Sequence, residues 1–155
     1  MENMKAGTFQ LKENWTIKRV NKYTGKVIDV EEKCNTIVNN GLERIAKLLN
    51  GVSSTYFRAL AIGTGTTGAT TSDTALETEY TRELATLAYE ASYKATFSKT
   101  FTFGSGVSED ITEAGIFDSD TASGSTMLAR TTFSAKSVSE SIDLIITATI
   151  TVARV

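Results

Sequence analysis

Apolar and polar residues alternate along much of this chain, a pattern typical of half-buried β-strands. The alternating apolar positions near the amino terminus are Phe9, Leu11, Trp15 and Ile17. Glu13 interrupts this series, and Lys12, Asn14 and Thr16 occupy positions between its members. A second long alternation runs from Ile142 to Val152. Both segments therefore predict strands with one face toward a core.

The strongest alternation lies in the middle of the chain. One face would carry Leu87, Tyr89, Ala91, Tyr93, Ala95, Phe97, Phe101 and Phe103. Strands usually run 3–10 residues, so we expect a turn or bulge within this stretch. The pattern leaves residues 91–94 and Lys99 as alternative positions for it.

Shorter apolar runs predict the remaining strands, with turn residues between them. The expected strands are residues 26–30, 56–62, 111–117 and 127–133. The expected loops and turns are residues 21–25, 63–78, 104–110 and 118–125. The series suggests an antiparallel β-sandwich.

One segment has helical spacing instead. Leu42, Ile45, Ala46 and Leu49 follow an i, i+3, i+4, i+7 pattern, which predicts one amphipathic α-helix near residues 40–50. Asn39 or Asn40 would cap its start and Gly51 would end it. We expect Leu42, Ile45 and Leu49 to be core residues packed on the sheet.

These elements predict a mainly β protein with a jelly-roll-like sandwich. The chain has 155 residues, enough for one ordinary domain. Residues 1–7 lack patterned apolar positions and are expected to form a flexible arm, since chain ends are usually mobile without such anchors. Residues 8–155 would form a single β-sandwich domain.

Charge and hydropathy limit the classes of partner that the chain is expected to bind. The net charge of −2, without a run of Lys or Arg, argues against nucleic-acid binding, which normally uses a basic field. No apolar run approaches the ~20 residues of a membrane span. The amino terminus lacks the apolar core of a signal peptide, so we expect synthesis in the cytoplasm.

Residue types also limit the chemistry. The chain has no histidine, the commonest general base and metal ligand. Its one cysteine, Cys34, has no partner for an internal disulfide and is expected to be a semi-buried, inert thiol. We therefore expect no catalytic centre, no metal and no cofactor.

A glycine-rich motif follows one of the expected strands. Residues 63–68 read Gly-Thr-Gly-Thr-Thr-Gly, a literal G-x-G-x-x-G after an expected strand. A dinucleotide site needs a helix directly after such a loop. Residues 69–73 are a poor helix start, so a surface loop is the favoured interpretation over phosphate binding.

Two further groups have functional alternatives. The acidic residues Glu109, Asp110, Glu113, Asp118 and Asp120 are close in sequence. They favour a solvated acidic loop, with a weak calcium site or paired-carboxylate catalysis as alternatives. Trp15 and the aromatics of residues 89–103 could line a sugar platform, but period-two spacing favours a core or an interface.

Several segments resemble small virion proteins of tailed bacteriophages. The resembling segments are residues 35–51, 61–67, 73–79, 111–118 and 127–131. The likeness covers most of residues 35–133. Proteins of this type include capsid decoration, tail and fibre components.

The resemblance implies a non-enzymatic structural role in the virion, with no functional residue carried across. Its leading form is a capsid decoration or cement protein that binds the major capsid protein or tail subunits and forms a homo-oligomer in the particle. The alternative is a tail, collar, baseplate or fibre component, with host sugars read by Trp15, Tyr23, Tyr56 or loop residues.

Overall fold

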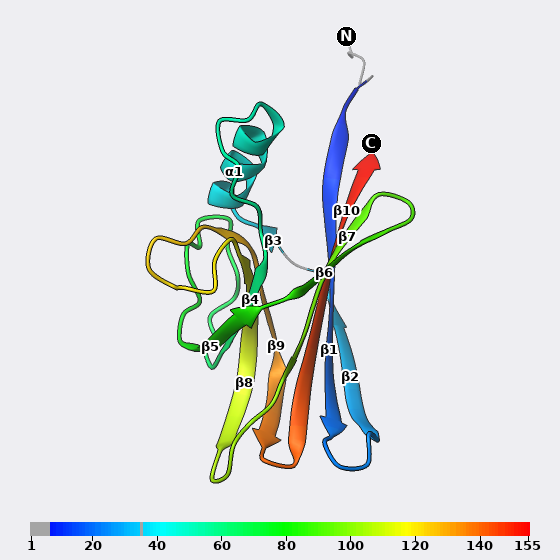
Figure 1. The fold of residues 1–155 in the computed structure, drawn as a ribbon, viewed down its shortest axis with the longest axis vertical. Helices are drawn as coiled ribbons and strands as arrows, with labels where there is room; N and C mark the ends of the chain where they lie inside the picture. The colour runs from blue at the N-terminus through cyan, green and yellow to red at the C-terminus, as the bar shows by residue number, and fades with distance from the viewer. Residues whose placement is uncertain (1–6, 35) are drawn as a thin grey trace.

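The computed structural model describes residues 7–34 and 36–155, which form a mainly antiparallel β structure with one helix (Figure 1). The amino-terminal elements are β1 (Phe9–Asn21), β2 (Val27–Lys33), β3 (Thr36–Ile37), α1 (Asn39–Leu49) and β4 (Ala59–Gly63). The remaining strands are β5 (Glu79–Leu84), β6 (Thr86–Glu90), β7 (Lys94–Phe101), β8 (Ser108–Phe117), β9 (Met127–Ser139) and β10 (Ile142–Arg154).

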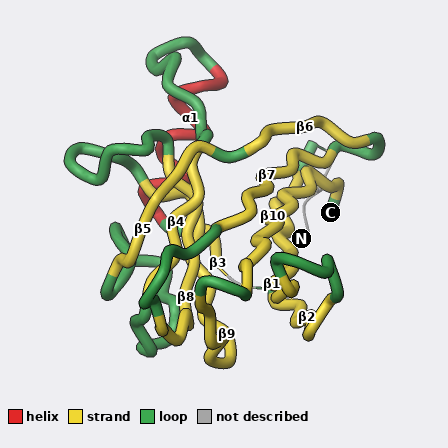
Figure 2. Tube along the Cα trace, turned by 60° about the horizontal axis from the view of Figure 1, so that its bottom comes forward, coloured by secondary structure: helices red, strands yellow, loops and turns green. Residues whose placement is uncertain are grey.

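The strands form two layers joined at one hairpin. One layer has the order β2-β1-β10-β7-β6 and the other has the order β5-β4-β8-β9-β3. β9 and β10 pair only at Ser139 and Ile142, beside their turn, so the layers separate beyond it. Figure 2 shows the two groups of strands diverging from that end. The expected antiparallel sandwich is therefore confirmed.

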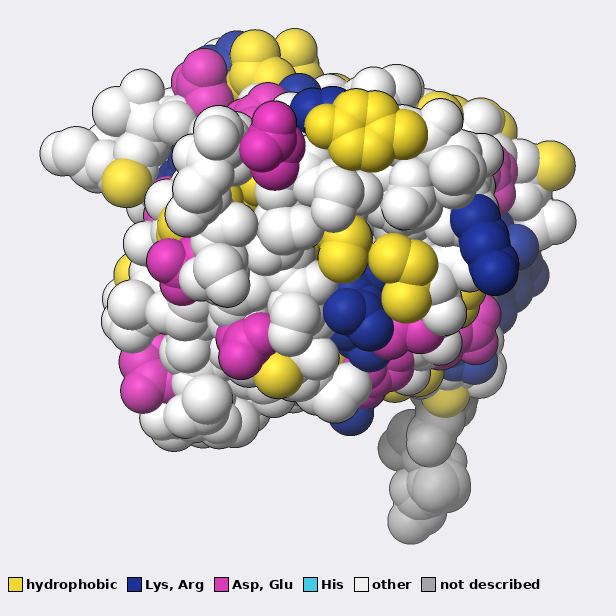
Figure 3. All heavy atoms as spheres, turned by 90° about the horizontal axis from the view of Figure 1, so that it is seen from below, with side chains coloured by type: hydrophobic (Ala, Val, Ile, Leu, Met, Phe, Trp, Pro, Cys, Tyr) yellow, Lys and Arg dark blue, Asp and Glu magenta, His cyan; other side chains and the backbone are white. Residues whose placement is uncertain are grey.

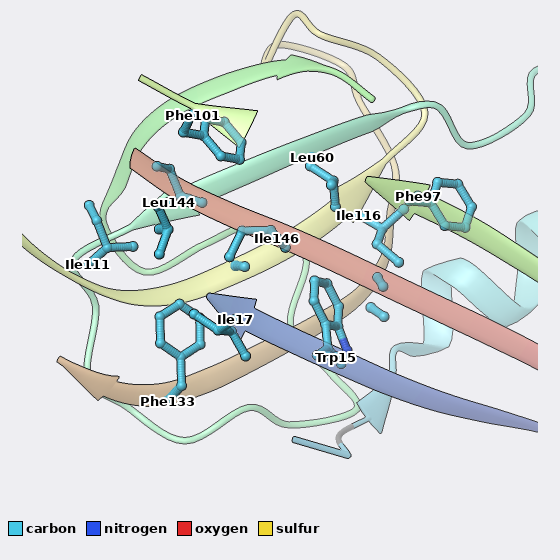
Figure 4. Packing of buried hydrophobic residues seen from close by; sticks show 14 of the residues in the cluster. Trp15, Ile17, Leu60, Phe97, Phe101, Ile111, Ile116, Phe133, Leu144 and Ile146 are labelled. Atoms are coloured by element: carbon cyan, nitrogen blue, oxygen red, sulfur yellow. The ribbon is translucent and has the colours of Figure 1, made fainter. Parts of the chain in front are cut away.

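The inner faces of both layers supply the core (Figure 4). Trp15 and Ile17 of β1 are fully buried, as the alternation predicts. They meet Leu144 and Ile146 of β10 and side chains from the other layer, including Leu60, Ile116 and Phe133. β1 and β10 pair from Phe9–Arg154 to Asn21–Ile142, which aligns their apolar positions on one face.

The long middle alternation contains a turn at one of its two expected positions. β6 and β7 form a hairpin around residues 91–93, in which Ser92 and Tyr93 have positive φ. Phe97, Phe101 and Phe103 are buried, whereas Leu87, Tyr89 and Tyr93 are exposed. The apolar face therefore continues past the area that the second layer covers.

The helix exists, but its expected packing is wrong. Leu42 is 49% exposed and Leu49 is 78% exposed, while Ile45 is half-buried against the core. The helix approaches the sheet at Gly41, where an added Cβ would lie 2.6 Å from the Leu128 carbonyl oxygen. This backbone contact, and not the leucine face, positions α1 on β9.

The expected helix start also differs. Asn39 and Asn40 lie inside α1, and Val38 occupies the N-cap position without a side-chain cap hydrogen bond. The Asn39 N–H instead donates to the Thr71 carbonyl oxygen at 2.8 Å. Gly51 follows the helix with a left-handed backbone φ of +76°, which suits its expected role in ending the helix. The expected arm falls outside the described residues, apart from Gly7.

Candidate functional site

The loop of residues 64–78, which we call the glycine loop, is held in place by a buried carboxylate. Glu113 of β8 is fully buried and accepts hydrogen bonds from the N–H groups of Gly65, Glu77 and Thr78, at 3.0, 3.0 and 2.8 Å. An added Cβ at Gly65 would lie 2.6 Å from Glu113 Oε1. The loop thus binds an anion through its backbone, but this anion is the chain's own Glu113.

Arg130 of β9 completes this loop anchor. Its guanidinium donates to Glu113 at 2.9 Å, to Asp73 at 2.8 Å and to the Thr67 carbonyl oxygen at 2.8 Å. Burial disfavours the charged guanidinium, yet Asp73 and Glu113 raise the pKa of Arg130 above its ordinary value. Residues 64–78 are therefore held on the sheet as a structural loop, and no helix follows them within the described chain.

The expected acidic loop is wrong for two of its five members. Besides Glu113, Asp118 is buried at 4% exposure, where it accepts from the Thr126 N–H and from Arg44 of α1. Glu109, Asp110 and Asp120 are exposed. Asp118 is occupied by protein donors, and the described residues contain no group of three or more potential metal ligands.

Two other candidates lie in unexpected surroundings. Cys34 is exposed, so the expected semi-buried thiol is wrong. Trp15 has no exposed surface and therefore cannot present its ring to a sugar. Tyr23 and Tyr56 are exposed at 70% and 56%.

The most distinctive open feature is an apolar groove between α1 and the start of β1. We call it the α1–β1 groove, and its lining residues are Phe9, Gln10, Leu11, Ile37, Leu42, Ile45, Ala46 and Leu49. Its volume is about 500 Å³ and none of these side chains carries a charge. The exposed leucines of α1 thus form one wall of a groove whose other wall is the uncovered end of the first layer.

The polar contacts of the helix hold this wall in place. Arg44, on the side of α1 that meets the sheet, donates to Thr126 Oγ1 at 2.9 Å and to the Thr55 carbonyl oxygen at 3.2 Å, in addition to Asp118. The groove is therefore lined by elements that are fixed to the sandwich. The opposite end of the molecule has its hydrophobic side chains dispersed among polar and charged ones (Figure 3).

Such a surface suits binding to another apolar surface. Contiguous exposed apolar surface commonly marks a protein interaction site, because burying it releases ordered water. The groove offers no carboxylate, hydroxyl or thiol among its lining residues. Within the described residues, no helix is long and apolar enough to span a membrane.

Comparisons with known proteins add no identification. No protein-family model, no curated protein and no solved structure matches the chain.

Proposed function

We propose that this chain is a non-enzymatic structural component of a tailed-phage virion, with capsid decoration as its leading role. The observation that supports this most is the uncharged α1–β1 groove, whose helical wall is held on the sandwich by the hydrogen bonds of Arg44. The sequence resemblance over residues 35–133 supplies the virion context. The partner would be a segment of another virion subunit, such as the major capsid protein.

The groove defines the chemistry of that partner segment. The lining side chains are apolar except for Gln10, so a charged residue placed there would lose water without gaining an ion pair. Two or three apolar side chains on a segment with few charges would fit a space of this size. Attachment would then depend on burial of Leu42 and Leu49, which folding of the chain itself leaves exposed.

A tail, collar, baseplate or fibre position remains the alternative role. The exposed Tyr23 and Tyr56 are the remaining candidates for sugar contact in that alternative, since Trp15 is buried. A screen of the purified protein against host-surface glycans tests this role. Binding that is lost with Tyr23→Ala or Tyr56→Ala would favour the fibre position over decoration.

Imaging of purified particles tests the proposal directly. Particles carrying a labelled version of the chain are compared with particles from which its gene has been deleted. Many copies distributed over the head support decoration. A few copies at the tail support the alternative, and absence from purified particles would refute the virion role.

A further inference from the structure

β6 is an unprotected edge strand. It closes one end of the first layer, pairs with β7 on one side, and all five of its residues are exposed. The strand carries no lysine and no proline, two residue types that natural edge strands use to prevent pairing. Since no strand in residues 7–34 and 36–155 pairs with its outer side, the outer backbone N–H and C=O groups can pair with another strand.

The other edge strands, β2, β5 and β3, are less suited to pairing with a second copy. β2 would place Asp29 opposite Glu31 if it paired antiparallel with its own copy around Val30, and like charges directly opposite are destabilising. β5 carries Glu79, Arg82 and Glu83, and β3 has two residues. Among the strands that the structure describes at layer ends, β6 is the one that combines length with low charge.

The sequence of β6 matches itself in antiparallel pairing. With Ala88 on a two-fold axis, each Leu87 lies opposite the Tyr89 of the second copy, and Ala88 lies opposite Ala88. The same register places Thr86 opposite Glu90, so the two carboxylates do not face each other. Aromatic–aliphatic pairs of this kind stabilise antiparallel strands.

Side chains beside the edge support the same contact. Leu87 and Tyr89 are 43% and 73% exposed on the face that elsewhere forms the core. They border an apolar hollow of about 330 Å³ that also includes Phe57, Ala95 and Phe97. A second β6 would add its own Leu87 and Tyr89 beside this hollow.

We propose that two copies of this chain associate through antiparallel β6–β6 pairing centred on Ala88. This pairing joins the β6-containing layer of one copy to the same layer of the other copy in one continuous sheet. This gives a specific site to the self-association that the virion role implies, but it does not require that role. Pairing through a five-residue strand buries less surface than a standard interface, which buries about 800 Å² on each partner. The pairing is consequently weak and concentration-dependent for the free protein.

Disulfide trapping of the purified protein tests the register. In a Cys34→Ser background, Ala88→Cys should form a covalent dimer under mild oxidation, because directly opposite residues have the Cα separation that a disulfide needs. Thr86→Cys alone and Glu90→Cys alone should give little dimer. A mixture of these two variants should give a cross-linked heterodimer.

A disruptive variant guards against random cross-linking. Leu87→Lys in the Ala88→Cys, Cys34→Ser background should abolish most of the dimer, since it places a charge at the paired edge while replacing an exposed side chain. Efficient cross-linking of Ala88→Cys with selective pairing of the mixed variants supports the proposal. Equal cross-linking at all positions, no cross-linking at Ala88→Cys, or dimer that persists with Leu87→Lys would overturn it. Because no particle is used, these results are independent of the location test.

Discussion

Arg130 donates its Nε hydrogen to Oε2 of Glu113 at 2.9 Å, joining two charged side chains in neighbouring buried strands. Glu113 is fully buried, and the Arg130 side chain is 3% exposed. The pair connects β8 and β9 to the glycine loop, since each member also bonds to residues between 64 and 78. The stability of the loop and of this part of the sheet should therefore depend on both charges.

Removing the carboxylate should be costly. Glu113→Ala removes one of the carboxylates that balance the charge of Arg130. It also leaves three backbone N–H groups without their acceptor. We expect a loss of about 3–5 kcal/mol in the free energy of unfolding, the usual effect of breaking a buried pair from one side. Urea unfolding measures it. The exposed Glu109→Ala is the control and should change stability by less than about 0.5 kcal/mol; similar effects for both variants would contradict the buried role.

The close packing of Gly41 predicts whether its replacement by alanine raises or lowers the stability of the protein. Replacing glycine with alanine inside a helix normally stabilises by about 1 kcal/mol. In this helix the new Cβ would lie 2.6 Å from the Leu128 carbonyl oxygen and 2.8 Å from its Cα. Gly41→Ala should therefore destabilise by about 1–3 kcal/mol through overpacking. Thermal unfolding checks this, with Asn40→Ala at the neighbouring exposed position as control, and a stabilised Gly41→Ala would show that α1 does not pack through its glycine.

The acid stability of the protein should depend on Glu31 and Lys136. Burial opposes ionisation of Glu31, but hydrogen bonds from Lys136 and Ser134 lower its pKa from 4.5 to about 2. Lys136 Nζ lies 2.8 Å from Glu31 Oε2 and also contacts Asp29, so it joins β9 to β2. A carboxyl with a lowered folded-state pKa stabilises fully above its unfolded value and loses this contribution as the pH falls.

The expected loss therefore falls between pH 4.5 and about 2. Lys136→Met removes the main favourable contact of Glu31, so stability should depend less steeply on pH across this window. Urea midpoints measured across the window check the slope. Lys12→Met on the exposed face of β1 is the control and should retain the wild-type slope. An unchanged slope in Lys136→Met would contradict the assignment.

Alternation predicted the strands because side chains of a strand point to opposite faces, and the buried Trp15 and Ile17 follow that rule. It could not predict how far the second layer extends. Leu87 and Phe97 belong to the same face and are paired across β6 and β7, yet only Phe97 is buried. The same limit affected α1, whose apolar face was correctly located but packs on the core only through Ile45, while Leu42 and Leu49 stay exposed.

The sequence contains an indication of the contacts that hold the glycine loop, but local patterns did not identify it. Glu113 and Arg130 are charged residues in strands that also carry fully buried apolar side chains, an arrangement that usually requires a buried partner. Reading Glu113 with its acidic neighbours in sequence placed it in solvent. The pairing of Gly115 with Arg130 across β8 and β9 supplies the missing long-range relationship, which no local pattern contains.

The most direct test of the central claim is rebinding of purified protein to particles that lack it. Leu42→Gln combined with Leu49→Gln alters the groove while keeping good helix formers and exposed positions, so folding stability should stay close to wild type. Ile28→Thr with Val30→Thr removes exposed apolar surface from β2 instead and is the matched control. We predict that the groove variant occupies particles much less than wild type and the control equally well. Full occupancy by the stably folded groove variant would contradict attachment through the α1–β1 groove.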